Sequence, residues 1–150
     1  MTAIFAAHAY DDLADSLAQK RIDIDSDTLK CLLMATYTPD TSHTFLDEVK
    51  AAGTEASGTG YTAGGVTLTS VTWTKTSGVW ALKATIPAWD ATGGALTGRY
   101  AIFYDATPGT DATRPVIAYW DLANNADVTA TDNTFTLTQH ASGIVTVDAA

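Results

Sequence analysis

The sequence predicts a mainly β protein, an antiparallel β-sandwich or jelly-roll-like domain with one short N-terminal α-helix. Several segments carry apolar residues at every second position, and two more are apolar at nearly every position. Gly, Pro, Asn and Asp separate these segments at near-regular intervals, as the turns of a sandwich require. The length of 150 residues fits a single domain. We expect an N-terminal arm and helix over residues 1–20 and a β-sandwich over residues 29–150.

The N-terminal helix is predicted from one apolar stripe. The stripe consists of residues that recur every four positions, namely Phe5, Ala9, Leu13 and Leu17. Lys20 and Arg21 follow, and cations suit the negative end of a helix. The helix is therefore expected to end near residue 20.

Three alternating aspartates come next, and their spacing matches the first ligands of a calcium-binding loop. They are Asp23, Asp25 and Asp27. The match then fails, because Thr28 stands where the loop needs Gly and Met34 stands where it needs Glu. We expect a solvated turn here, followed by a buried strand over residues 29–35.

A long loop is predicted over residues 37–65, and its second half is rich in glycine. The spacing of Gly58, Gly60, Gly64 and Gly65 does not match a dinucleotide-binding fingerprint, and no Lys follows as in a P-loop. These glycines are expected to adopt positive φ angles in a surface loop. A loop of this length in a small domain usually has a function.

Period-two patterns predict the remaining strands. The apolar face changes between Leu68 and Val71, which predicts a β-bulge near Ser70. The runs 100–104 and 116–120 are almost wholly apolar and predict a central hairpin buried on both faces. Further strands are expected over residues 80–86, 134–138 and 144–147.

Charge and composition exclude several classes of function. Seventeen acidic and eight basic side chains give a net charge of −9, which disfavours nucleic acid as a partner. No apolar run is long enough to span a bilayer, and the N-terminus lacks the basic region of a secretory signal, so we expect a soluble protein made in the cytoplasm. The lone Cys31 allows no internal disulfide and no thiolate cluster, and we expect neither a metal nor a cofactor.

No catalytic motif is recognisable, and we expect no enzymatic activity. The three histidines, His8, His43 and His140, stand in no motif that pairs a base with a nucleophile. A small hydrolase with an unrecognised dyad remains an alternative. Tryptophans could instead bind a glycan by ring stacking. Trp80 and Trp120 lie in core-like patterns, whereas Trp89 lies beside a Gly-Gly turn and is the tryptophan expected to meet a partner.

A set of segments in this order is similar to stretches found in small structural proteins of tailed bacteriophages. The segments span most of the chain and are Ile22–Lys30, Tyr37–Asp40, His43–Leu46, Gly58–Gly65, Arg99–Tyr104 and Pro115–Trp120. The chain departs from the pattern at Trp120-Asp121-Leu122, where a second acidic residue or an Ile is expected. The resemblance implies a virion component without enzymatic activity that decorates or cements the capsid.

The leading hypothesis is therefore a protein on the capsid surface of a virion, bound to the major capsid protein and forming a homo-oligomer there. The N-terminal ten residues combine large apolar side chains with alanines and precede the first acidic residue, Asp11, so they are candidate contacts. The predicted partner-binding residues are Ile4, Phe5, His8, Tyr10, Tyr61 and Trp89. The alternative is a tail- or fibre-associated module that recognises a glycan or receptor through Trp89.

Overall fold

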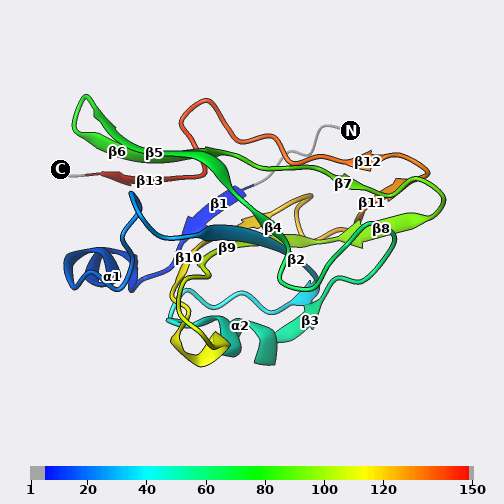
Figure 1. Ribbon diagram of the computed structural model, residues 1–150, viewed down its shortest axis with the longest axis horizontal. Coiled ribbons are helices and arrows are strands. Elements are labelled where there is room, and N and C mark those ends of the chain that lie inside the picture. The colour runs from blue at the N-terminus through cyan, green and yellow to red at the C-terminus, as the bar shows by residue number, and fades with distance from the viewer. Residues whose placement is uncertain (1–5, 149–150) are drawn as a thin grey trace.

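The computed structural model describes residues 6–148 and confirms a mainly β architecture with antiparallel sheets and two short α-helices in that range (Figure 1). One layer contains the main sheet, a second layer of strands lies above it, and α2 lies below it in the view of Figure 1. The arrangement is consistent with a β-sandwich-like domain.

The elements in chain order are β1 (Ala6–Ala9), α1 (Leu13–Ala18), β2 (Leu29–Tyr37), α2 (Leu46–Ala51), β3 (Gly53–Glu55), β4 (Val66–Thr67), β5 (Thr69–Thr76), β6 (Val79–Thr85), β7 (Trp89–Asp90), β8 (Ala95–Gly98), β9 (Tyr100–Asp105), the 3-10 turn η1 (Asp111–Thr113), β10 (Val116–Asp121), β11 (Val128–Thr131), β12 (Thr134–Phe135) and β13 (Val145–Asp148).

The main sheet has the strand order β1-β10-β9-β2-β3, with β4 also paired to β2. The predicted central hairpin is confirmed as the antiparallel pair β9 and β10, in which Ile102 lies opposite Tyr119. Strand β2 pairs with the other side of β9, with Leu32 opposite Ile102. Long apolar runs thus occupy the middle of the sheet, where both faces are covered.

Alternate residues of these strands belong to two separate cores. On β2, Cys31 and Leu33 face the second layer of strands, whereas Leu32 and Met34 face the opposite side, where α2 packs. All four side chains have no exposed surface. Burial also raises the pKa of the Cys31 thiol, as expected of an inert core cysteine.

The second layer contains the three-stranded sheet β13-β6-β5 and the two-stranded pair β12-β7, and the pair β11-β8 lies at one end of the molecule, where β8 leads into β9 (Figure 1). Leu82, Phe135 and Ile144 of this layer pack in the same core as Phe103 and Trp120 of the main sheet. The buried Trp120 also donates a hydrogen bond from Nε1 to the Ile144 carbonyl over 2.9 Å. That bond links the two layers directly.

The predicted N-terminal helix is wrong in its first half. Residues 6–9 form strand β1, with His8 opposite Tyr119 of β10, and the helix is confined to Leu13–Ala18. The alanines favour a helix locally, but pairing with the edge of the main sheet decides the conformation. The end of the helix is as predicted, since Lys20 has a φ of 55° and Arg21 pairs with Asp12 and Asp15.

The predicted long loop over residues 37–65 is only partly a loop, because it contains α2 and β3. Leu46 and Val49 are fully buried and lie three residues apart, on the side of α2 that faces the main sheet. The Glu48 carboxylate accepts hydrogen bonds from the amides of Phe45 and Thr44 and so caps the helix. These two apolar residues are too few for a periodic pattern in the sequence.

One local prediction is confirmed and a second is confirmed in part. The register between β5 and β6 shifts between Thr69 and Thr72, and Ser70 has a φ of 51°, as expected of a bulge. In the glycine-rich loop, Gly60, Gly64 and Gly65 have positive φ angles as predicted, whereas Gly58 does not, and a Cβ at Gly65 would clash with the Cys31 carbonyl oxygen. Only glycine allows the loop to approach β2 this closely.

The aspartate turn before β2 forms a local hydrogen-bonded structure. The Asp27 carboxylate accepts from the Asp23 amide over 2.7 Å, and the Asp23 carboxylate accepts from the Asp25 amide over 3.2 Å. The neighbouring Asp105 has no exposed surface, and its carboxylate accepts a hydrogen bond from the Thr107 amide over 2.8 Å. Burial, together with the neighbouring Asp27, raises the pKa of Asp105 to about 6.

Replacing Ile102 or Ile117 with Asp is expected to abolish folding. Each side chain is almost completely buried, Ile102 in the core against α2 and Ile117 in the core between the layers. An unpaired carboxylate in either place costs several kcal/mol, out of a total stability of about 5–15 kcal/mol. Circular dichroism during urea titration is the measurement, with the exposed Thr74→Asp as control. A cooperative transition in either isoleucine variant would contradict the assignment.

The raised pKa of the buried Asp105 carboxyl group predicts that stability falls as pH rises from about 4 to about 6. An unfolded aspartate titrates near pH 3.9, so folding takes up a proton in this window. The change Asp105→Asn keeps the acceptor for the Thr107 amide and removes the charge. We expect it to raise the free energy of unfolding by about 1–2 kcal/mol at pH 7 and hardly at all at pH 4.

Urea denaturation at both pH values measures this effect, with Asp25→Asn, on an exposed aspartate, as the control. Equal stabilisation at pH 4 and pH 7 would show that Asp105 does not take up a proton on folding.

Candidate functional site

The predicted N-terminal contact residues separate into different environments. Ile4 and Phe5 lie outside the described residues. His8 is exposed on β1, and its ring stacks on Tyr119 with centroids 4.8 Å apart. Tyr10, by contrast, is only 2% exposed. Its hydroxyl lies 3.1 Å from that of Tyr37. Tyr10 is therefore a core residue and not a surface contact as predicted.

Tyr61 is half-buried, and hydrogen bonds fix its ring. Its hydroxyl donates to the Glu55 carboxylate over 2.9 Å and accepts from the Leu33 amide over 3.1 Å. Burial raises the pKa of this hydroxyl. Glu55 also accepts a hydrogen bond from the Gly64 amide. Tyr61 thus ties the glycine-rich loop to the main sheet.

Trp89 is buried, which corrects the prediction that it meets a partner. It is 2% exposed and packs between Tyr61 and Phe135, at centroid distances of 6.0 and 5.9 Å. Its position beside a turn suggested exposure, but β7 pairs with β12 and directs the indole into the core. The structure therefore groups the described candidates as two pairs, one around Tyr119 and one around Trp89.

A different pair of tryptophans lines a hollow at the surface. Trp73 on β5 and Trp80 on β6 are half-buried, and their rings stack with centroids 5.7 Å apart and planes inclined by 8°. Trp80 was predicted to belong to the core. It is instead the second residue of β6, next to the turn of the β5–β6 hairpin, and this turn lies at the same end of the molecule as α1 (Figure 1).

The turn of this hairpin explains the stack. Ser77 and Gly78 have φ angles of 51° and 86°, as in a two-residue hairpin turn with positive φ at both positions. This turn places Lys75 opposite Trp80 and puts Trp73 diagonally across from it on the same face. The Ser-Gly dipeptide between two apolar alternations is the sequence signal that could have revealed the pair.

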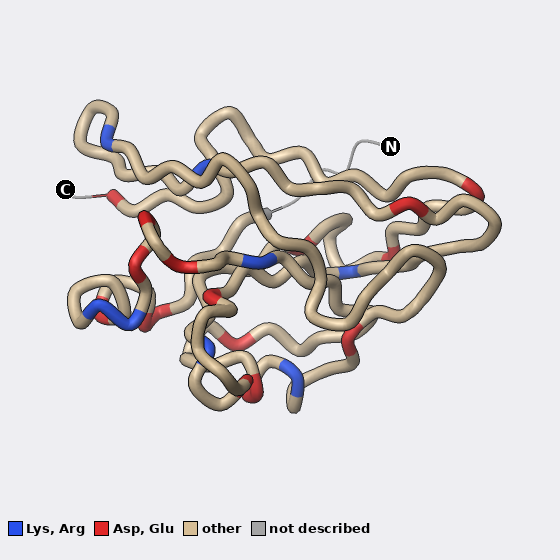
Figure 2. The backbone as a smooth tube through the Cα atoms, in the orientation of Figure 1, with Lys and Arg blue, Asp and Glu red and all other residues tan. Residues whose placement is uncertain are grey.

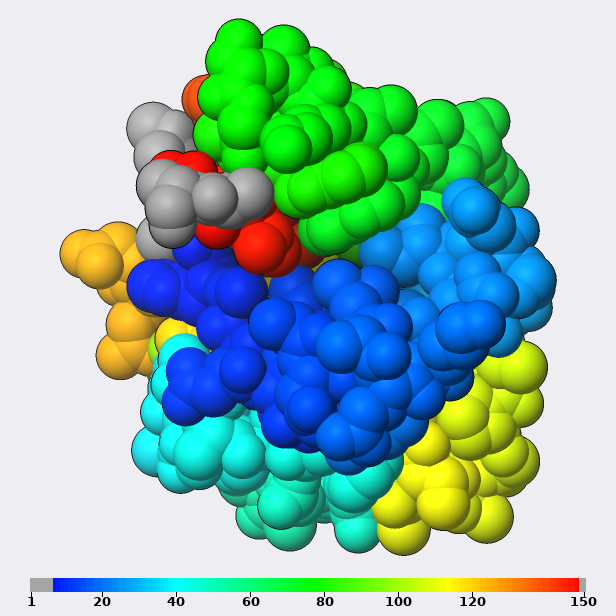
Figure 3. Space-filling model, turned by 90° about the vertical axis from the view of Figure 1, so that its left-hand side faces the viewer, coloured from blue at the N-terminus to red at the C-terminus, as the bar shows by residue number. Residues whose placement is uncertain are grey.

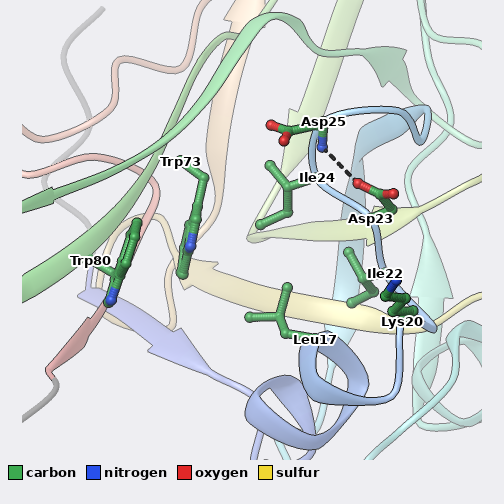
Figure 4. A pocket seen from close by; sticks show the side chains of 8 residues that line it. All are labelled: Leu17, Lys20, Ile22, Asp23, Ile24, Asp25, Trp73 and Trp80. Atoms are coloured by element: carbon green, nitrogen blue, oxygen red, sulfur yellow. Dashed lines mark hydrogen bonds between the residues drawn. The ribbon is translucent and has the colours of Figure 1, made fainter.

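Opposite the tryptophans, α1 and the segment that follows it form the second wall. Leu17, Ile22 and Ile24 face Trp73 across the hollow, which has a volume of about 500 Å³ (Figure 4). In the view onto this end of the molecule, the hairpin lies above α1 and the aspartate turn (Figure 3). We call this hollow, with Trp73 and Trp80 on one side and these apolar residues on the other, the tryptophan slot.

The rim of the tryptophan slot carries charges of both signs. Lys20, Asp23 and Asp25 line it and are exposed, and the Asp25 carboxylate lies above Ile24 at the mouth (Figure 4). The Lys75 ammonium lies 5.9 Å from the centre of the Trp80 ring. The slot thus combines an aromatic surface, an aliphatic wall, and hydrogen-bond donors and acceptors at its edge. This is the composition of a ligand-binding site for a small polar molecule with an apolar face.

The histidines take part in local hydrogen bonds. His43 Nδ1 lies 3.0 Å from the Tyr37 hydroxyl, and His140 Nδ1 lies 2.7 Å from the Ser142 hydroxyl. The second pair is exposed and lies within one turn, where the Ser142 amide also bonds to the same ring nitrogen. Within residues 6–148, no group of three or more potential ligand side chains could hold a metal ion.

No protein-family model matches the chain, and neither a curated protein nor a solved structure is found to be similar to it. Neither α1 nor α2, the α-helices of the described range, has the length and apolar character that crossing a bilayer demands.

The burial of Trp89 leads to a stability prediction. Replacing Trp89 with Ala is expected to lower the free energy of unfolding by about 3–5 kcal/mol, because it leaves a cavity between Tyr61 and Phe135. Urea denaturation checks this, and Thr92→Ala in the exposed turn that follows is the control. A loss below about 1 kcal/mol would be typical of an exposed ring and would contradict the core assignment.

Proposed function

We propose that this protein is a non-enzymatic structural component of a tailed-bacteriophage virion that decorates or cements the capsid. Its main partner would be the major capsid protein, and it would form a homo-oligomer on the capsid surface. The proposal is carried by the resemblance of several segments of the sequence, in their order along the chain, to small structural proteins of tailed bacteriophages.

The segments that carry the resemblance lie next to one another in the fold, which supports treating them as one set. Arg99–Tyr104 and Pro115–Trp120 provide the hairpin of β9 and β10, and Ile22–Lys30 leads into β2. Gly58–Gly65 is the loop that Tyr61 fastens to the same sheet. The similar segments therefore build one continuous part of the molecule, the main sheet and its nearest loops. A likeness carried by contacting segments is more informative than one carried by scattered residues.

The negative net charge of the protein favours a position on the outer surface of the capsid. Acidic side chains outnumber basic ones and are spread over the loops and ends of the sandwich (Figure 2). Such a surface is repelled by the phosphates of packaged nucleic acid. It is compatible with an outer position, where the protein meets solvent and the shell.

The contact with the shell is proposed at the β1 edge. Strand β1 is the outermost strand of the main sheet next to β10, and no residue from Ala6 to Ala9 is a lysine, proline or acidic residue that would block strand pairing. His8 is exposed there. Ile4 and Phe5 directly precede this strand in the sequence, so the proposed contact runs from residue 4 to His8.

The alternative, a tail- or fibre-associated module that recognises a glycan or receptor through Trp89, loses its key residue because that ring is buried. Immunogold labelling of intact particles separates the two locations. Label over the head supports the proposal, and label restricted to the tail tip favours the alternative.

Binding to capsids is the direct test. Purified protein mixed with expanded heads that lack it should cosediment in a fixed ratio to the major capsid protein. Deleting residues 2–5 leaves all paired residues of β1 in place. It should keep the melting temperature within a few degrees and weaken head binding by roughly 30-fold or more, as loss of an aromatic anchor does. Failure of the intact protein to bind heads at any maturation stage would contradict the proposal.

A further inference from the structure

The tryptophan slot lies at the hairpin end of the sandwich and has no part in the capsid contact proposed above. Its aromatic side is a stack of Lys75, Trp80 and Trp73. One face of the Trp73 indole packs on Trp80, and the other is turned toward the slot (Figure 4). Because the stack holds the ring from behind, Trp73 offers a flat apolar surface whose orientation is already fixed.

Polar groups are placed around this surface without internal partners. Among residues 6–148, neither the Trp73 nor the Trp80 indole N–H has a hydrogen-bond acceptor, and the Asp25 carboxylate has no donor. The carboxylate of Asp23 accepts from the Asp25 amide, which holds the turn beside Ile24. Donors and acceptors therefore line the mouth, while Leu17, Ile22 and Ile24 close the opposite side.

The charges at the mouth discriminate between ligand classes. A cationic side chain would be attracted to Asp23 and Asp25 but would meet Lys20 on the same rim and Lys75 behind the stack. An anionic ligand would meet the two aspartates. A neutral ligand with many hydroxyl groups avoids both repulsions, because hydroxyls donate to carboxylates and accept from ammonium and indole N–H groups.

We propose that the tryptophan slot binds a neutral saccharide, with the apolar C–H face of a sugar ring on Trp73 and ring hydroxyls on Asp25 and Lys20. The volume of about 500 Å³ lies in the range of small-ligand sites, roughly 300–1,000 Å³. The site would let the protein hold a sugar polymer while its β1 edge is occupied elsewhere. It does not depend on the capsid role, since the isolated chain contains every residue of the slot.

Titration of the purified protein with four uncharged hexasaccharides tests the proposal. The probes are maltohexaose, cellohexaose, chitohexaose and mannohexaose, followed by tryptophan fluorescence and by the NMR signals of the indole N–H groups. At least one probe should bind in a saturable way and shift the indole signals of Trp73 and Trp80. The signals of the buried Trp89 and Trp120 should move much less.

Variants locate the binding. Trp73→Ala should weaken the affinity for that probe roughly tenfold or more, about 1.4 kcal/mol, and Asp25→Ala, on an exposed turn, should weaken it without changing the melting temperature. Thr74→Ala, next to Trp73 on the opposite face of β5, is the matched control and should bind like the original protein.

Three outcomes would overturn the proposal. The first is that none of the four saccharides binds, and the second is that Asp25→Ala and Trp73→Ala both bind with unchanged affinity. The third is that hexa-arginine shifts the same indole signals while no saccharide does, which would make the slot a site for a basic peptide. None of these measurements uses capsids, so failure here and failure of head binding are separate results.

Discussion

Everything in this fold depends on a sheet whose middle strands must be covered on both faces. Strands β2, β9 and β10 place apolar side chains alternately into two cores, and residues such as Leu32 and Leu33 are equally buried on opposite sides. A strand of this kind cannot face water on either side. The chain therefore supplies two covers, the second layer of strands above and α2 with its neighbouring loops below.

The covers are held by a small number of polar links. Trp120 joins the main sheet to the second layer through the Ile144 carbonyl. On the other side, the Lys50 ammonium of α2 lies 2.9 Å from the Asp111 carboxylate of η1, which also pairs with Arg114. The side chains of Lys50, Asp111 and Arg114 are partly exposed, so each of these ion pairs contributes little to the free energy of unfolding. Their effect is to join the short helix α2 to η1 beside the apolar core that both help to cover.

The strands of the sandwich could be predicted because their signal is local, as in the continuous apolar runs of β9 and β10. The strand conformation of residues 6–9 could not be predicted, because pairing with β10, more than a hundred residues away, overrides the helical preference of alanine.

The positions of two tryptophans were also out of reach of local patterns, because they depend on how distant strands pack. The alternation of apolar residues shows that Trp80 lies on the same face of its strand as Leu82. It does not show where the opposite sheet ends, and so it gives no sign that the Trp80 ring lies outside the core. Trp89 is the reverse case: the turn residues beside it predict exposure, but β7 pairs with β12, and this pairing leaves no local signal in the sequence.

The natural cysteine Cys31 can report on opening of the sandwich through its reaction with a thiol reagent. It is the single cysteine of the chain, lies in β2 between β4 and β9, and has no exposed surface. A thiol reagent can reach it only after the two layers separate or β2 leaves the sheet. The rate of its modification under native conditions therefore measures how often the sandwich opens. Any partner that binds only the closed sandwich would slow that reaction by the factor by which it lowers the population of the open state.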